Sequence, residues 1–189
     1  MAEVRSDQNI NICVAFDNEE VGSGTKQGAD STFLEDVIVR IGESLAFSKE
    51  RMQQLIAEGF LISADNAHAV HPNHPEKADP TNRPYINGGV VIKSHGGQKY
   101  TTDAVSAAKL KLLCKDGQIP VQTFANRSDQ AGGSTLGNIS TAHVSISSVD
   151  IGMPMLAMHS AMETAGTFDN EYVARLFESF FRNGVSEIV

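Results

Sequence analysis

The chain lacks any long run of apolar residues. Hydrophobic residues make up 41% of its 189 positions and charged residues 20%, in a mixed order that leaves no segment able to span a bilayer. Residues 1–8, MAEVRSDQ, have neither the apolar centre of a secretory signal nor the arginine-rich, acid-poor character of an organelle transit segment. We therefore expect a soluble, cytoplasmic protein with no membrane partner.

Cysteine and net positive charge are also missing or scarce. The two cysteines, Cys13 and Cys114, lie in apolar-leaning segments without a paired spacing, which favours buried free thiols over a disulfide or a thiolate zinc site. The formal net charge of −8 repels a phosphate backbone, and the 15 Lys and Arg residues are scattered. The sequence thus indicates a reducing compartment and argues against nucleic acid as a partner.

Short apolar runs alternate with helical patterns along most of the chain, which is typical of an α/β fold with a largely buried sheet. The length suits one domain with a substantial core. The pattern predicts strands over 10–16, 60–64, 119–124 and 144–151, and helices over 33–47, 103–115 and 169–182, with another helix capped by Ser48 and ended by Gly59 and a short helix after Gly137. The stretch 72–84 holds four prolines and is the long irregular segment, of a kind that is often functional.

Acidic and imidazole side chains follow several of the predicted strands. Residues 17–20 (DNEE) come directly after the first strand, Asp65, His68 and His71 follow the second, and His159 lies shortly after the strand that ends at residue 151. In open α/β sheets, ligands bind outside the carboxyl ends of the strands. We therefore expect these side chains to converge on one edge of the sheet.

The adjacent Glu19 and Glu20 suit a hydrolytic metal site, because one carboxylate can bind a metal while the other moves a proton of the bound water. Taken alone, such a pair is more often part of a solvated loop. Asp65 and His159 at neighbouring strand ends weigh against that alternative.

His68 and His71 are three residues apart and would share one face of a helix, but Pro72 argues against a long helix here. Either histidine could equally be an ordinary loop residue. Their spacing alone therefore assigns neither of them as a ligand.

Gly22 and Gly24 lie between a predicted strand and a predicted helix, as in a phosphate-binding loop. The G-x-G-x-x-G pattern fails at Lys26 and Gln27, and the Gly-Lys-Ser/Thr ending is absent. These glycines are better interpreted as giving the backbone room around the glutamates.

Over nearly its whole length the chain resembles the M18 family of metallopeptidases, the aspartyl aminopeptidases. The resemblance is carried by the segments FDNEEVGSGTKQGADS, ISADNAHAVHPN, VVIKSHGGQKYTTDAVS, NRSDQAGGSTLG and LAMHS. It implies a three-layer mixed α/β sheet with helices on both faces, as in zinc exopeptidases, and release of N-terminal amino acids, typically acidic ones, from peptides. On this basis residues 1–189 are expected to form the C-terminal part of the catalytic domain.

The resemblance also implies roles for individual residues. The matching motifs place Glu19 as the general base that activates a metal-bound water, Glu20, Asp65 and His159 as zinc ligands, and His68, Lys93 and Tyr100 as substrate contacts. A fixed positive charge on Lys93 would favour an acidic substrate side chain, although a lysine after an apolar strand is usually just a solvated end.

A complete site of this family holds two zinc ions, and this chain matches only part of it. Family members are longer, and they draw another zinc-binding histidine and the aspartate that bridges the metals from sequence before the DNEE motif. They assemble into homo-oligomers through a second domain and receive a histidine from a neighbouring subunit. The resemblance therefore implies two ligands of one zinc and one ligand of the other, and an isolated chain with little or no activity. The alternative is a catalytically inert fragment that serves as an assembly or peptide-binding module.

Overall fold

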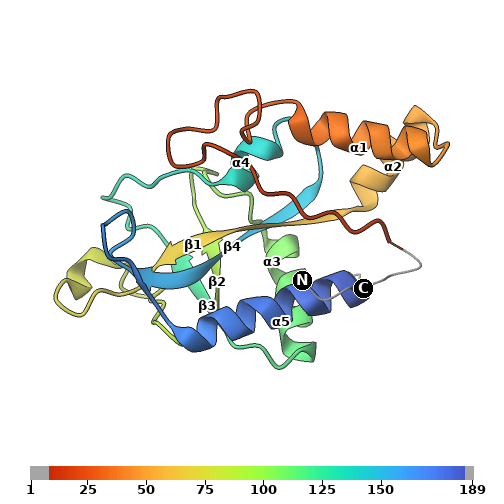
Figure 1. Ribbon diagram of the computed structural model, residues 1–189. Coiled ribbons are helices and arrows are strands. Elements are labelled where there is room, and N and C mark those ends of the chain that lie inside the picture. The colour runs from red at the N-terminus through yellow and green to blue at the C-terminus, as the bar shows by residue number, and fades with distance from the viewer. Residues whose placement is uncertain (1–8, 186–189) are drawn as a thin grey trace.

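The computed structural model describes residues 9–185, and a mixed β-sheet lies at its centre with helices on both faces (Figure 1). The strands are β1 (Phe60–His68), β2 (Val90–Ser94), β3 (Val121–Ala125), β4 (Ser147–Leu156) and β5 (Thr164–Ala165). Their order is β1-β4-β2-β3, with β5 added to β4. The pairs β1–β4 and β2–β3 are parallel, whereas β2–β4 and β4–β5 are antiparallel.

The helices form two layers around this sheet. They are α1 (Phe33–Ser44), α2 (Lys49–Glu58), the 3-10 turn η1 (Pro75–Lys77), α3 (Ala104–Asp116), α4 (Leu136–Ser140) and α5 (Thr167–Asn183). Figure 1 shows α3 and α5 on one side of the sheet and α4 with α1 on the other. The expected three-layer α/β fold is confirmed.

The main core lies on the α3 and α5 side of the sheet. Successive strand side chains alternate between faces, so β2 and β4 each send every second residue to this side. Val90, Ile92, Val149 and Ile151 from the strands pack with Leu110, Leu113, Cys114 and Leu176 from the helices. The opposite face carries a smaller apolar cluster (Ala67, Val91, Tyr100 and Phe124).

Two helices begin at capping residues, of which Ser48 was predicted and Asp103 was not. The Ser48 hydroxyl accepts a hydrogen bond from the Arg51 N–H at the start of α2. Asp103 and Ser106 form a reciprocal capping box at the start of α3. These local bonds fix helix positions that the apolar spacing alone leaves uncertain by a residue or two.

The predicted strand over residues 10–16 is wrong. In the described part of the chain this segment has no regular structure, and a hydrogen bond from Asn11 Nδ2 to the Phe181 carbonyl links it to α5. An apolar run becomes a strand only where a neighbouring strand pairs with its backbone. As a consequence Cys13 is exposed, and only Cys114 matches the predicted buried thiol.

The strand predicted over 144–151 begins later and continues further, because residues 144 and 146 belong to turns that follow α4. The strand predicted over 60–64 likewise extends to His68, since β4 pairs with it along its whole length.

Across residues 9–185, none of the helices combines the length and apolar character needed to cross a membrane.

Candidate functional site

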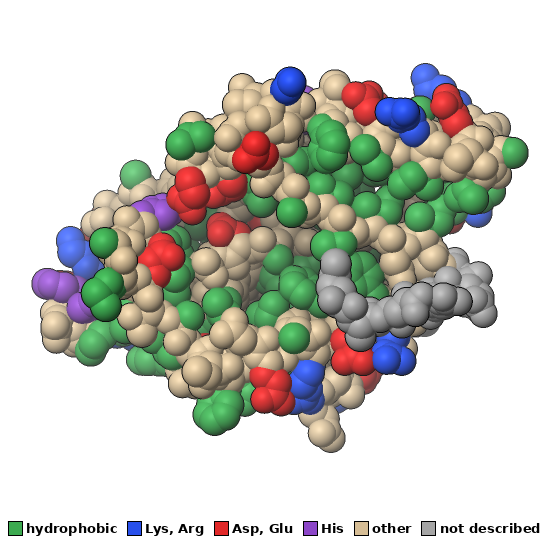
Figure 2. Space-filling model, in the orientation of Figure 1, with side chains coloured by type: hydrophobic (Ala, Val, Ile, Leu, Met, Phe, Trp, Pro, Cys, Tyr) green, Lys and Arg blue, Asp and Glu red, His purple; other side chains and the backbone are tan. Residues whose placement is uncertain are grey.

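A pocket of about 530 Å³ opens on the face of the sheet opposite α3 and α5, and Figure 2 shows acidic side chains around the hollow. All seven residues to which the resemblance assigns a role line it: Glu19, Glu20, Asp65, His68, Lys93, Tyr100 and His159. The irregular segment after His71 also contributes, through His74, Lys77 and Asp79.

The two glutamates are presented by a loop that is closed by its own side chains. Gln27 Nε2 donates to Asp17 Oδ2 at 3.2 Å, and Asn18 Nδ2 donates to Thr25 Oγ1 at 3.2 Å. Asn18 has a φ of +63°, a left-handed conformation that asparagine tolerates better than most residues. The loop therefore has a defined shape immediately before Glu19.

Gly22 supplies the backbone freedom expected around the glutamates. Its φ is +100°, which L side chains rarely adopt, and its N–H donates to the Glu19 carbonyl at 3.1 Å. This turn sends the chain back toward α1 after the glutamates.

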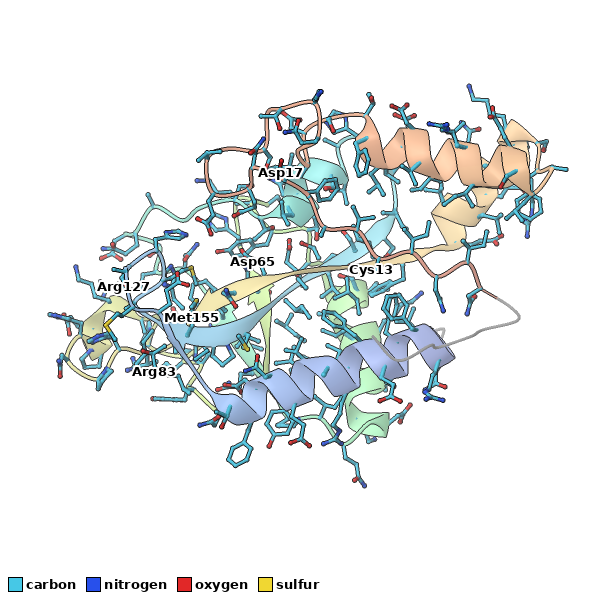
Figure 3. All side chains as sticks on the ribbon, viewed as in Figure 1. Cys13, Asp17, Asp65, Arg83, Arg127 and Met155 are labelled. Carbon is cyan, nitrogen blue, oxygen red and sulfur yellow. The ribbon has the colours of Figure 1, made fainter. Side chains whose placement is uncertain are left out.

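Asp65 lies on the pocket side of β1, below the loop that carries Asp17 (Figure 3). The sequence predicted Asp65 just after a strand, but it lies inside β1, opposite Gly152 of β4. Its Oδ1 accepts the Asn66 N–H at 2.6 Å, and its Oδ2 faces the Lys93 ammonium at 3.3 Å.

Lys93 is buried, with 3% of its surface exposed. It too lies within its strand, so the alternative of a solvated strand end is wrong. Its Nζ donates to the Asn66 carbonyl at 2.9 Å, pairs with Asp65, and lies 5.1 Å from the centre of the Tyr100 ring. A buried ammonium needs such partners, because an isolated charge in the interior is costly.

His159 lies in the loop after β4 with a φ of +67°. Its Nε2 is 3.5 Å from Glu20 Oε2, and both side chains are largely exposed, at 68% and 75%. A nitrogen and a carboxylate oxygen from segments far apart in the sequence thus meet at the rim of the pocket.

The electrostatic surroundings of Glu19 differ from those of an ordinary surface glutamate. Partial burial, followed by the nearby carboxylates of Asp65 and Glu20, raises the pKa of Glu19, while His159 and Lys93 act in the opposite direction. A raised pKa brings a carboxylate closer to the range in which it both accepts and returns a proton near neutral pH.

His68 and Tyr100 form the apolar side of the pocket around Phe124. Burial lowers the pKa of His68, and the charges of His159 and Lys93 act in the same direction, so the neutral imidazole is favoured. Burial likewise raises the pKa of Tyr100, against a hydrogen bond from Asn126. Both residues therefore offer uncharged hydrogen-bonding groups at neutral pH.

The side chains present fit zinc in kind but not in number. Glu20 and His159 supply an oxygen and a nitrogen that already converge, and these are donors that zinc prefers. Within residues 9–185, however, no three His, Cys, Asp or Glu side chains form a group that could hold a metal ion. The observed arrangement is a pair of donors with a third carboxylate, Asp65, engaged by Lys93.

Several pocket residues were missed in the sequence. Glu163 accepts the His159 N–H at 2.7 Å, and the polar loop 126–135 forms one wall of the pocket. Glu163 gave no signal, since it is a single glutamate with no acidic or histidine neighbour within three residues in the sequence. The loop was visible as a glycine-bearing segment, but nothing in its composition indicated that it returns to the sheet.

This fold and pocket define an α/β protein with carboxylate and imidazole groups gathered over a sheet, the class to which metal-dependent exopeptidases belong. The family model described as "Aminopeptidase I zinc metalloprotease (M18)" matches residues 1–181. The chain therefore belongs to the M18 family.

Individual relatives agree with this assignment. The chain is 52% identical over 171 residues to a probable M18 family aminopeptidase 2 of Clostridium novyi, covering 90% of this chain and 40% of that protein. It is 41% identical over 174 residues to aspartyl aminopeptidase 1 of Schizosaccharomyces pombe, covering 92% of this chain and 37% of that protein. The structure of the mApe1 dodecamer of S. cerevisiae superposes with a TM-score of 0.76 at 30% identity, over 89% of this chain and 37% of that one.

The chain thus spans about two fifths of the length of the curated relatives it matches. What those proteins do as wholes is consequently a proposal for this chain.

Proposed function

We propose that this chain forms the C-terminal part of the catalytic domain of a zinc aminopeptidase that releases acidic N-terminal residues from peptides. The observation that carries the proposal is the meeting of Glu19, Glu20, Asp65 and His159 in one pocket that has the buried Lys93 at its base. Membership of a family described as zinc metalloproteases supports the choice of metal.

In this proposal Glu20 and His159 hold one zinc ion and Asp65 contributes to a second. Their approach to 3.5 Å supports a shared metal for Glu20 and His159. Zinc supplies a Lewis acid that polarises a carbonyl and makes a water molecule acidic near neutral pH. Two protein ligands are fewer than the three or four of most zinc sites, so the proposal requires ligands beyond those that residues 9–185 supply.

Glu19 is the proposed general base. Partial burial, and then the carboxylates of Asp65 and Glu20, raise the pKa of Glu19, so its carboxyl group holds a proton more readily than that of an isolated glutamate. The ionised carboxylate takes a proton from a water molecule, and the carboxyl group so formed delivers that proton to the leaving amine of the peptide. Replacement by Gln keeps the shape and removes this capacity.

Lys93, His68 and Tyr100 are the proposed substrate contacts. The ammonium of Lys93 carries three donors, and the contacts with Asp65 and Asn66 use two of them. The remaining donor can serve an acidic side chain of the substrate, and the low exposure of the ammonium strengthens such a bond. The similarity to an aspartyl aminopeptidase supports this preference.

Two further parts of the proposal concern the whole protein. A homo-oligomer is supported by the dodecamer that a structural relative forms. A cytoplasmic location stays a prediction from the sequence.

Zinc titration of the purified chain by calorimetry tests the metal assignment. Glu20→Gln and His159→Gln are expected to weaken binding at least about tenfold, because each removes one of the two converging donors. The matched control is Glu43→Gln on α1, outside the pocket, which should bind zinc like the unchanged chain. Equal affinity in all four proteins would contradict the proposed metal site.

A further inference from the structure

The loop that carries His159 is a short hairpin with fixed ends. Strand β5 turns back along the end of β4, so that Met155 lies opposite Ala165 and Leu156 opposite Thr164. Residues 157–163 fill the connection, and Glu163 is the last of them. The backbone of Glu163 is therefore set by the strand pairing next to it.

Within this loop the backbone adopts conformations that non-glycine residues avoid. Ala157 and His159 have φ values of +57° and +67°. The Ser160 N–H donates to the Ala157 carbonyl at 3.0 Å, which closes a turn that contains His159. Left-handed residues persist only where their surroundings hold them, and they occur often at functional sites.

Packing contributes little to holding His159, since its side chain is 68% exposed. The contact that does bear on its backbone is the hydrogen bond from the His159 N–H to Glu163 Oε1, at 2.7 Å. An ionised carboxylate is a stronger acceptor for a backbone N–H than a neutral oxygen. Glu163 thus ties the strained residue to the fixed end of the hairpin.

We propose that Glu163 is a positioning residue, whose carboxylate holds the backbone of His159 so that the imidazole stays beside Glu20. This inference rests on the proposed function, because it gives the geometry of His159 a purpose in binding zinc. A second group that orients a metal ligand typically changes metal affinity by tenfold or more when it is removed. Glu163 acts here through the main chain of His159 rather than through its ring.

The test compares Glu163→Ala, which removes the acceptor, with Glu163→Gln, which keeps an oxygen at the same reach. Nuclear magnetic resonance measures the amide exchange rate of His159 and its N–H to Hα coupling, which reports φ. We expect Glu163→Ala to speed exchange about tenfold and to change the coupling, because a charge-assisted hydrogen bond is lost. In Glu163→Gln the exchange rate of the His159 amide should stay within about threefold of that in the unchanged chain. Glu43→Ala is the control for the loss of a surface carboxylate.

The same three variants are then titrated with zinc alone, alongside His159→Gln. Weaker zinc binding in Glu163→Ala, by about tenfold, supports the inference. If Glu163→Ala leaves exchange, coupling and zinc affinity unchanged while His159→Gln weakens zinc binding, the positioning role is wrong and the metal site stands. If His159→Gln leaves zinc binding unchanged, the proposed function fails, whatever the amide measurements show.

Discussion

Lys93 is a proposed substrate contact, and its buried ion pair also bears on the stability of the fold. Its ammonium is almost fully buried and is held by the Asp65 carboxylate, the Asn66 carbonyl and the face of Tyr100. Removing one member of a buried pair leaves the other without a counter-charge, which costs more than the pair contributes. Asp65 has a third of its side chain exposed, so water compensates it in part.

Lys93→Met should therefore lower the free energy of unfolding by about 2 to 3 kcal/mol. Urea denaturation followed by circular dichroism measures this change. Lys111→Met, at an exposed position of α3, should lie within about 0.5 kcal/mol of the unchanged chain. A loss no larger than that of the control would show that the ion pair contributes nothing to folding.

The two cysteines should differ in reactivity. Burial raises the pKa of Cys114 from 9.0 to about 12, whereas Cys13 is exposed. The thiolate is the reactive form, so a thiol reagent at pH 8 should label Cys13 alone in the folded protein and both cysteines in urea. Labelling of Cys114 at the same rate in both states would contradict its burial.

The sign of the pH effect follows from the raised pKa of Cys114. The folded state holds this proton more tightly than the unfolded state, so the associated stability is complete below pH 9 and is lost as the pH rises toward 12. The free energy of unfolding of Cys114→Ala should decline less over this pH interval than that of the unchanged chain, since the variant has no thiol to titrate there.

At the scale of elements, Asp169 joins the start of α5 to the turn before β2. Its side chain is fully buried, with Oδ2 accepting the Asn87 N–H at 2.6 Å and Oδ1 accepting the Gly89 N–H at 2.9 Å. Asp169 also lies in the first turn of α5, where a negative charge is favoured by the helix dipole. A helix that covers one face of the sheet is thus attached to the strand that carries Lys93.

Asp169→Ala should destabilise the protein by about 3 kcal/mol, because two buried N–H groups lose a charged acceptor. Asp169→Asn should recover part of this loss, because the amide oxygen still accepts one of the two N–H groups. The recovery is incomplete because the amide NH2 faces the other N–H group, donor against donor. Thermal or urea unfolding measures both, with Asp116→Ala at the exposed end of α3 as the control. The prediction fails if Asp169→Ala matches Asp116→Ala.

The helices were better predicted from the sequence than the strands, and the reason is physical. A helix satisfies its backbone within one segment, so apolar spacing and caps such as Ser48 and Asp103 define it locally. A strand depends on a partner from elsewhere in the chain. Residues 10–16 have a strand pattern but no such partner among the described residues, whereas β1 and β4 run longer than predicted because they pair with each other.

At the scale of the whole molecule, the sequence identified residues that line the pocket, but it did not predict where Asp65 and Lys93 lie in their strands. Motif resemblance selected the seven side chains that line the pocket, and the rule that ligands bind beyond strand ends placed several of them there. Asp65 lies inside β1 because β4 pairs with that strand as far as His68, and Lys93 lies inside β2 because β3 pairs with it as far as Ser94. The length over which two strands pair is not readable from any single segment.

The purified chain is expected to show no measurable hydrolysis of peptides with an acidic N-terminal residue, and to bind zinc with a dissociation constant on the order of 1 μM or weaker. Two converging protein ligands hold zinc less firmly than a complete set. A chromogenic peptide assay with added zinc measures the activity. Turnover that disappears in Glu19→Gln would show that the chain is a working catalyst by itself.

The position of β4 between β1 and β2 has a consequence for the order in which the chain folds. Asp65 and Lys93 belong to strands that do not pair with each other, and the strand that brings them within reach is synthesised last of the four long ones. Its register with β1 joins residues far apart in the chain, which makes this a slow type of contact to form. The pocket should therefore appear late in refolding, as a single event when β4 inserts, and a nascent chain that has not yet reached residue 156 has no such pocket to offer.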